Sequence, residues 1–136
     1  MGGRGRGFTL IEMMLVIAIL AILALIMVPN FMRARSRSQL AGCEGNLKAL
    51  GTSLEAYAAD NAAHYPSSMD GLVSAGTLRY IPTCPATARD TYSEGYETHI
   101  VPDIYTIECG GSNHGVLDIP SNFPQYSSIR GLAEQP

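Results

Sequence analysis

The sequence predicts an α+β fold, in which one long N-terminal helix packs on a small head with about three antiparallel strands. Residues 8–29 are apolar apart from Thr9 and Glu12, which is the composition of a membrane helix. Residues 40–57 repeat apolar side chains at helical spacing, and residues 96–109 predict two strands. At 136 residues the chain is long enough for one domain and short for two.

The first element is a predicted transmembrane helix at residues 8–29. A bilayer core about 30 Å thick requires about 20 apolar residues in a helix, and these 22 residues supply that length. An ordinary secretory signal has a shorter apolar core that ends at a small-residue cleavage site. Because this run ends in Val-Pro-Asn-Phe instead, we expect it to stay in the protein.

A basic stretch, MGGRGRG, precedes the apolar segment and ends at Gly7. Residues 7–12, GFTLIE, resemble the processing motif of type IV pilins and type II secretion pseudopilins. The resemblance implies the type IV pilin fold and removal of a leader, residues 1–7, by a prepilin peptidase that cuts between Gly7 and Phe8. It also implies methylation of the new amino group of Phe8. The segment after the cut would then be both the membrane half and the assembly half of the helix.

Glu12 is the one carboxylate inside the apolar segment. A charge in this position is costly unless it is paired or protonated. Cleavage would create a partner, the amino group of Phe8 on a neighbouring subunit, so we expect Glu12 to set the register between packed helices. The alternative is a glutamate that lies close enough to the helix end to reach headgroup water.

Positive charge lies on both sides of the apolar segment. Arg4 and Arg6 precede it, but Arg33, Arg35 and Arg37 follow it, so counting charges points away from a cytoplasmic N-terminus. The cleavage motif requires a cytoplasmic N-terminus, and we follow the motif. We expect a single-pass protein of the bacterial inner membrane with its head in the periplasm, which later enters a periplasmic or extracellular filament.

Residues 30–62 are the predicted amphipathic half of the same helix. Pro29, which matches the proline of the family, has no N–H for the carbonyl of Leu25, so we expect a kink there. Beyond it, six apolar side chains follow one another at spacings of three and four residues, and we expect the head to pack on this stripe. They are Leu40, Cys43, Leu47, Leu50, Leu54 and Tyr57.

The membrane half of this helix cannot also be buried against its own head at residues 63–136. When it leaves the lipid it must therefore find other protein partners, which predicts a helical homopolymer. The resemblance implies further partners, namely the prepilin peptidase and methyltransferase, an inner-membrane assembly platform, and minor pilins or pseudopilins.

The head begins with turn residues and is predicted to be mostly β. Residues 60–67, DNAAHYPS, resemble the stretch that follows the long helix in major pseudopilins, and residues 69–78 predict one or two helical turns. Three strands are predicted, at residues 96–101, at residues 104–109 and near residues 116–119.

The chain has three cysteines, so at most one intramolecular disulfide can form. We favour Cys84 with Cys109, which would close a loop of about 25 residues and contribute about 3 kcal/mol in the chain-entropy model. Cys43 lies on the apolar stripe and is interpreted as a small buried residue. A bond from Cys43 to either of the other two stays open.

The spacing of histidines and cysteines does not predict a metal site. Cys109 and His114 are five residues apart, but no second close-spaced ligand pair accompanies them. An oxidising compartment would also tend to consume the thiols, so we expect no zinc and no other cofactor. Calcium is a weak candidate because related major pseudopilins carry a calcium loop in the head. The available carboxylates, which lack EF-hand spacing, are Asp90, Glu94, Asp103 and Asp118.

Catalysis and nucleic-acid binding are not expected. Ser112, His114 and Asp118 are residue types of a catalytic triad, but they lie in no nucleophile motif. The net charge of −3 and the lack of a basic groove argue against general affinity for nucleic acid.

The sequence therefore predicts a structural subunit of a type IV pilus or of a type II secretion pseudopilus. The compact head and residues 60–67 favour a pseudopilin, whereas a disulfide-closed C-terminal part favours a pilin, and both stay open. The alternatives are a membrane-anchored binding domain that does not polymerise and, within the family, a minor rather than a major subunit.

Overall fold

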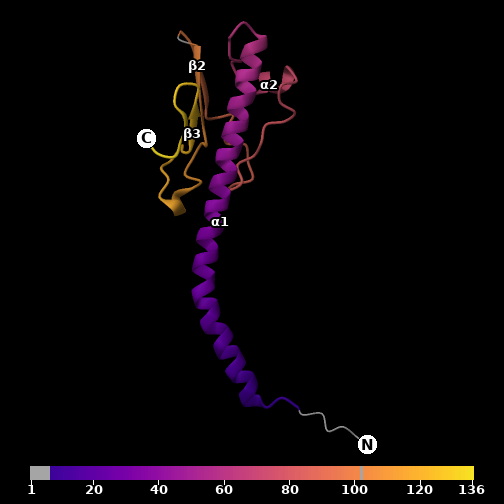
Figure 1. Ribbon diagram of the computed structural model, residues 1–136, viewed down its shortest axis with the longest axis vertical. Helices are drawn as coiled ribbons and strands as arrows, with labels where there is room; N and C mark the ends of the chain where they lie inside the picture. Colours follow the sequence, from indigo (N-terminus) through magenta and orange to yellow (C-terminus); the bar gives the residue numbers. More distant parts are fainter. Residues whose placement is uncertain (1–6, 102) are drawn as a thin grey trace, which may run out of the picture. The chain divides into compact units, whose positions relative to one another are not determined.

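The computed structural model describes residues 7–101 and 103–136, which form two compact units divided between Ala34 and Arg35 (Figure 1). The predicted α+β class is confirmed, with one long helix and a four-stranded antiparallel sheet. Residues 1–6 of the predicted leader, with Arg4 and Arg6, lie outside the described residues. The elements are α1 (Leu10–Asp60), α2 (Asp70–Ser74), β1 (Tyr96–Ile100), β2 (Asp103–Glu108), η1 (Gly115–Leu117), β3 (Gln125–Ser127) and β4 (Gly131–Ala133).

In the unit that ends at Ala34, the described residues from Leu10 onward all belong to α1. Among the described residues, α1 is the one helix long and apolar enough to cross a membrane, and its apolar stretch is not buried by the rest of the protein. The helix continues through Pro29, and the Asn30 side-chain amide donates to the carbonyl oxygen of Ile26 at 3.3 Å. The kink expected at Pro29 stays a prediction.

The second unit, from Arg35 to Pro136, has a core built on the last part of α1. Four members of the predicted apolar stripe are fully buried there, which confirms that stripe as the packing face. They are Cys43, Leu47, Leu50 and Leu54. Figure 1 shows β2 and β3 beside this part of α1, and the buried side chains Tyr105 and Ile107 of β2 belong to the same core.

The sheet is an antiparallel meander in the order β1-β2-β3-β4. The two longer strands were predicted correctly, and in β2 burial alternates as a strand with one face on a core requires. The loop between α1 and the sheet also contains the predicted helical turns, as α2. The last two strands, each of three residues, were not predicted.

The third predicted strand, near residues 116–119, is wrong. This segment forms the 3₁₀ turn η1 and ends at Asp118, whose φ of 59° is left-handed and cannot continue a strand. Val116 is 75% exposed, so its apolar side chain contributes nothing to the core. The sheet instead continues beyond the cis-bonded Pro124, at β3 and β4.

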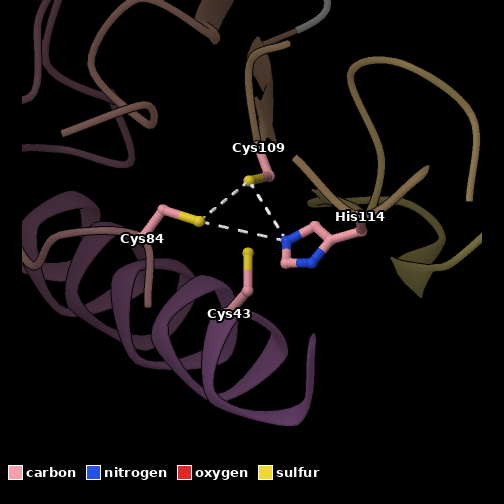
Figure 2. A group of neighbouring side chains, drawn as sticks. All are labelled: Cys43, Cys84, Cys109 and His114. Atoms are coloured by element: carbon pink, nitrogen blue, oxygen red, sulfur yellow. Dashed lines mark hydrogen bonds between the residues drawn. The ribbon is translucent and has the colours of Figure 1, made fainter. Parts of the chain in front are cut away.

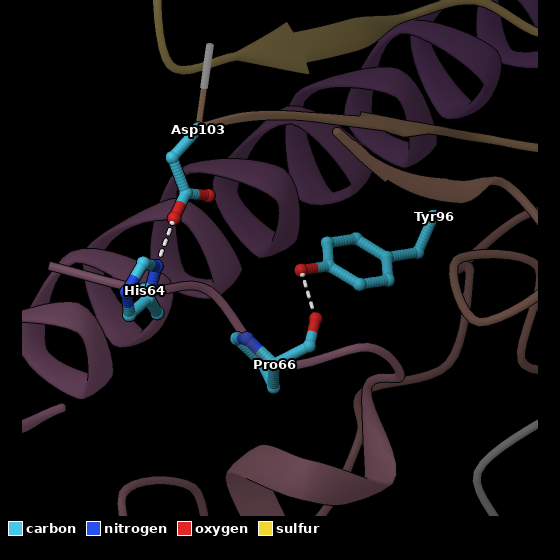
Figure 3. A network of polar contacts seen from close by, with 4 residues as sticks. All are labelled: His64, Pro66, Tyr96 and Asp103. Atoms are coloured by element: carbon cyan, nitrogen blue, oxygen red, sulfur yellow. Dashed lines mark hydrogen bonds and ion pairs between the residues drawn. The ribbon is translucent and has the colours of Figure 1, made fainter. Parts of the chain in front are cut away.

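Two contacts hold the loop after α1 against β1 and β2 (Figure 3). The Tyr96 hydroxyl donates to the carbonyl oxygen of Pro66 at 2.7 Å, and His64 Nδ1 lies 2.7 Å from a carboxylate oxygen of Asp103. The His64 side chain is 68% exposed, so its pair with Asp103 is worth little. The bond to Pro66, which is buried, is the stronger restraint.

Gly51 is a point of close approach between α1 and the sheet. A Cβ added there would overlap the Tyr126 ring, with Cδ1 at 2.9 Å and Cε1 closer still. The Tyr105 hydroxyl also donates to the Gly51 carbonyl oxygen at 3.4 Å. By contrast, Gly45 on the same helix has nothing within 4 Å of an added Cβ.

We predict that Gly51→Ala destabilises the head and Gly45→Ala does not. Alanine gains about 1 kcal/mol of helix propensity at either position, but at Gly51 overpacking costs about 1–3 kcal/mol. All seven tyrosines lie in residues 57–126 and the chain has no tryptophan, so tyrosine fluorescence of the full chain in detergent follows unfolding of the head. Equal unfolding midpoints for the two variants would contradict the close packing at Gly51.

Candidate functional site

The N-terminal end of α1 is capped by reciprocal hydrogen bonds between Thr9 and Glu12. The backbone N–H and the hydroxyl of Thr9 both donate to Glu12 Oε2 at 2.8 Å, and the Glu12 N–H donates to Thr9 Oγ1 at 3.3 Å. Because α1 begins at Leu10, Thr9 is its N-cap and Glu12 is its third residue, which is the arrangement of a capping box. The carboxylate thus also lies at the positive end of the helix dipole.

Glu12 therefore has a partner within the chain, which sequence reasoning missed. The Thr-x-x-Glu spacing at the start of an apolar run is the signal that could have revealed it. Since Thr9 and Glu12 both follow Phe8, a cut after Gly7 would leave the capping box intact. Gly7 itself is exposed, and an added Cβ there meets nothing within 4 Å. The register role of Glu12 stays a prediction.

The first part of α1 presents an apolar surface that the other described residues do not bury. Every large apolar side chain from Phe8 to Met32 is between 43% and 79% exposed. Soluble proteins that act alone rarely expose apolar patches larger than a few hundred Å². This surface therefore requires lipid, other protein helices, or each of these in turn.

The unit from Arg35 to Pro136 contains a buried cysteine–histidine cluster, formed by Cys43, Cys84, Cys109 and His114 (Figure 2). Cys43 lies on α1, and Cys84 begins a turn in which the Ala88 N–H donates to the Cys84 carbonyl oxygen. Cys109 directly follows β2, and His114 directly precedes η1. Their side chains point toward a common centre, and their ligand atoms all lie within 4.8 Å of one another.

The sulfur and nitrogen atoms of the cluster are close but not bonded. Cys84 Sγ and Cys109 Sγ are 3.6 Å apart, and His114 Nε2 lies 3.6 Å from Cys109 Sγ and 3.9 Å from Cys84 Sγ. The cysteines are fully buried and His114 is 4% exposed. Water therefore has little access to any of these atoms.

Polar groups around the cluster are directed at its sulfur atoms. The Tyr92 hydroxyl donates to Cys43 Sγ at 3.3 Å, and the Asn113 amide donates to Cys109 Sγ at 3.6 Å. Burial, followed by the bond to Cys43, raises the pKa of the Tyr92 hydroxyl, which therefore keeps its proton. Hydrogen bonds, the strongest with Cys43, lower the pKa of the Cys109 thiol.

The predicted disulfide partners Cys84 and Cys109 are neighbours in the structure, but all three cysteines are free. Their sulfur separation of 3.6 Å is far longer than the roughly 2.05 Å of a disulfide bond. Cys43 is buried as expected, but it lies in the same cluster as the other two. The pairing therefore stays a prediction.

Zinc was not expected because a second pair of close-spaced ligands is missing and because an oxidising compartment would consume the thiols. The structure removes the first of these two reasons. The four ligand types converge from separate segments, so no spacing in the sequence could announce them. The calcium candidates do not converge: among the described residues, no group of three carboxylates forms a possible metal site. Asp103 instead pairs with His64, and Asp90 accepts hydrogen bonds from the backbone N–H groups of Tyr92 and Ser93.

The remaining candidates do not assemble into a site. Ser112 and Asp118 are exposed, whereas His114 is buried in the cysteine–histidine cluster. Arg33, Arg35 and Arg37 are exposed on α1. The described residues thus offer two places with specific chemistry, the start of α1 and the cysteine–histidine cluster.

Comparison with known proteins gives one family model and a set of relatives. The model, described as a prokaryotic N-terminal methylation motif, matches residues 3–28. Type II secretion system core protein G of Dickeya chrysanthemi is 35% identical over 124 residues, which cover 89% of this chain and 78% of the relative. The same protein of Escherichia coli (strain K12) is 34% identical over 122 residues, 88% of this chain and 81% of the relative.

The similarity to a pilin is higher in identity but shorter. Type IV major pilin protein PilA of Myxococcus xanthus is 50% identical over 54 residues, which cover 40% of this chain and 24% of that protein. No solved structure matches significantly.

Proposed function

This chain belongs to the type IV pilin-like family that includes type II secretion system core protein G, and on this premise we propose that it is a filament-forming subunit of a type II secretion system. The observation that carries the proposal is the uncovered apolar surface between Phe8 and Met32. A subunit stored in a membrane and later packed among identical helices satisfies this surface in both states. A membrane-anchored subunit that never polymerises would bury this apolar surface only in lipid.

The extent of similarity supports a secretion filament rather than a pilus. The relatives named core protein G align with nearly nine-tenths of this chain, helix and head together. The similarity to the pilin covers 40% of the chain and leaves most of it unmatched. The head is the part of such a subunit that faces its surroundings, so the relatives that share the head are the better guide to function.

Processing at the N-terminus is part of the proposal. A prepilin peptidase cuts between Gly7 and Phe8, and the new amino group of Phe8 is methylated, in agreement with the match to the methylation motif. The cut requires the leader to face the cytoplasm, which places the head on the far side of the inner membrane. The assembly platform and minor subunits of the secretion system are the further partners.

Glu12 has two roles in this proposal. Within one chain it caps α1 through Thr9, and this bond partly satisfies the carboxylate. A carboxylate has room for several donors, so Glu12 can also accept the charged amino group of Phe8 from a neighbouring subunit. That second bond would fix the stagger between adjacent helices.

The choice of system is tested by deleting the gene in its own host. We predict that the enzymes exported by the type II system accumulate inside the cells, while surface pili and twitching motility are unchanged. Expression of the unaltered chain in the deletion strain is the control and should restore export. Normal export together with loss of pili would show that the chain is a pilin instead.

We predict that Gly7→Ala blocks cleavage without disturbing the protein itself. An added Cβ at Gly7 meets nothing within 4 Å, so a failure reports recognition by the peptidase and not misfolding. Intact-mass measurement of membrane-extracted protein should find mainly the uncleaved chain. Gly45→Ala, which also has open space, should be cut normally. A mature Gly7→Ala chain in normal yield would contradict the cleavage assignment.

A pair of Glu12 variants separates the register role from the capping role. Glu12→Ala loses both, whereas Glu12→Gln keeps an oxygen that accepts the Thr9 N–H but carries no charge. We predict that both variants insert into the membrane and are cleaved. Both should reduce the yield of sheared filaments by at least about tenfold. The reason is that the charged amino group of Phe8 on the neighbouring subunit loses its partner, and an unpaired charge in apolar surroundings costs more than about 1.4 kcal/mol. Normal filament yield for Glu12→Gln would leave capping as the role of this residue.

A further inference from the structure

We propose that the cysteine–histidine cluster is a structural zinc site, with Cys43, Cys84, Cys109 and His114 as its four ligands. Three thiolates and one imidazole are an established ligand set for tetrahedral structural zinc. The inference concerns the unit from Arg35 to Pro136, which contains all four residues, and does not depend on the filament proposal. It rests on the geometry of the ligand atoms, their burial and the donors around them.

The distances between the ligand atoms fit a tetrahedron around one ion. With Zn–S of about 2.3 Å and Zn–N of about 2.05 Å, a regular tetrahedron has S···S edges of about 3.8 Å and S···N edges of about 3.6 Å. The observed separations are 3.6 Å between Cys84 Sγ and Cys109 Sγ, and 3.6 Å and 3.9 Å from these atoms to His114 Nε2. Cys43 Sγ lies within 4.8 Å of the other three ligand atoms. An ion at the common centre in Figure 2 therefore needs only small side-chain shifts.

The burial of His114 calls for a strong partner at Nε2. His64 and His99 are exposed, whereas His114 is 4% exposed. A buried polar atom is costly without a good hydrogen bond, and the two sulfur contacts of Nε2, at 3.6 Å and 3.9 Å, are weak ones. A bond from Nε2 to a metal ion would satisfy this atom completely.

The donors around the sulfur atoms are suited to thiolates. The Asn46 side-chain amide donates to the Tyr92 oxygen at 3.2 Å and to the Thr83 carbonyl at 3.0 Å, so the Tyr92 proton is left to point at Cys43 Sγ. The Asn113 amide donates to Cys109 Sγ. Donors of this kind stabilise the negative charge of metal-bound sulfur and orient the ligands.

The ligand chemistry selects zinc among common divalent ions. Sulfur-rich tetrahedral sites favour zinc, while calcium and magnesium prefer oxygen ligands. Binding of Zn²⁺ replaces the three thiol protons, which leave to solvent, and gives a site with a net charge of −1. No electron transfer is involved, so the step needs no oxidant.

The same cysteines allow a competing state, which the experiment must separate. A disulfide between Cys84 and Cys109 would remove two of the four ligands, so zinc and this disulfide cannot occupy one chain together. The disulfide would leave Cys43 unused, but the zinc site requires it. Cys43 is therefore the residue that distinguishes the two states.

The test uses the full chain, extracted from membranes in detergent without reductant or chelator. Elemental analysis measures bound zinc, and intact mass after alkylation under denaturing conditions counts free thiols. We expect one zinc per chain and three alkylated cysteines. One alkylated cysteine without zinc would overturn the proposal in favour of a disulfide. Three alkylated cysteines that bind no zinc after titration with Zn²⁺ would also overturn it.

Variants assign the ligands. Cys43→Ser and His114→Ala should lose the zinc, whereas His99→Ala, at an exposed histidine, should keep one ion per chain. His114→Cys supplies a fourth thiolate and should recover zinc binding, which guards against loss through misfolding. Retention of one zinc by Cys43→Ser would overturn the four-ligand site.

Two readouts of the unaltered chain support the variants. Replacement of zinc by Co²⁺ should produce thiolate-to-cobalt charge transfer and the visible bands of tetrahedral cobalt. Removal of the ion by a chelator should lower the unfolding midpoint of the head by more than about 10 °C, and added Zn²⁺ should restore it. An unchanged midpoint after chelation would overturn the structural role.

Tyr92→Phe keeps all four ligands but removes the hydroxyl that donates to Cys43 Sγ. This variant should weaken zinc binding by about 10–100-fold.

Discussion

The buried face of α1 is the surface on which the core of the head is built. Cys43, Leu47, Leu50 and Leu54 follow one another along this face, and each is fully buried. The sheet contributes Tyr105 and Ile107 to the same core, because burial alternates along β2. The large apolar side chains between Phe8 and Met32 are exposed instead. One helix thus serves two surroundings, and its sequence changes accordingly from apolar all round to apolar on one face.

Periodic patterns made the large elements predictable. The apolar run predicted the membrane half of α1, and the apolar stripe predicted its packing face. The two longer strands were predicted from their composition. The strands Gln125–Ser127 and Gly131–Ala133 were missed because three residues are too few for a period of two to stand out. The strand near residues 116–119 was predicted wrongly for a related reason. An apolar residue such as Val116 in a short segment resembles a strand, but residues 115–117 form a 3₁₀ turn that ends at the left-handed Asp118.

The two specific sites differ in how far a sequence can reveal them. The bonds between Thr9 and Glu12 are local, so their Thr-x-x-Glu spacing was visible and only its meaning was missed. The cysteine–histidine cluster is not local: the last part of α1, then α2 and the loops around it, separate Cys43 from Cys84. No spacing rule links them, and only the packing of the loop that contains Cys84 on α1 brings their sulfur atoms together.

The position of Cys43 on α1 gives the zinc site a mechanical consequence that a disulfide lacks. A bond between Cys84 and Cys109 would join two loops of the head to each other and leave their attachment to α1 to side-chain packing. A metal bound also by Cys43 would join both loops, and the turn before η1, directly to the helix. In a filament whose subunits connect through α1, any load on the head passes to that helix. Bound zinc would therefore strengthen the connection that carries this load.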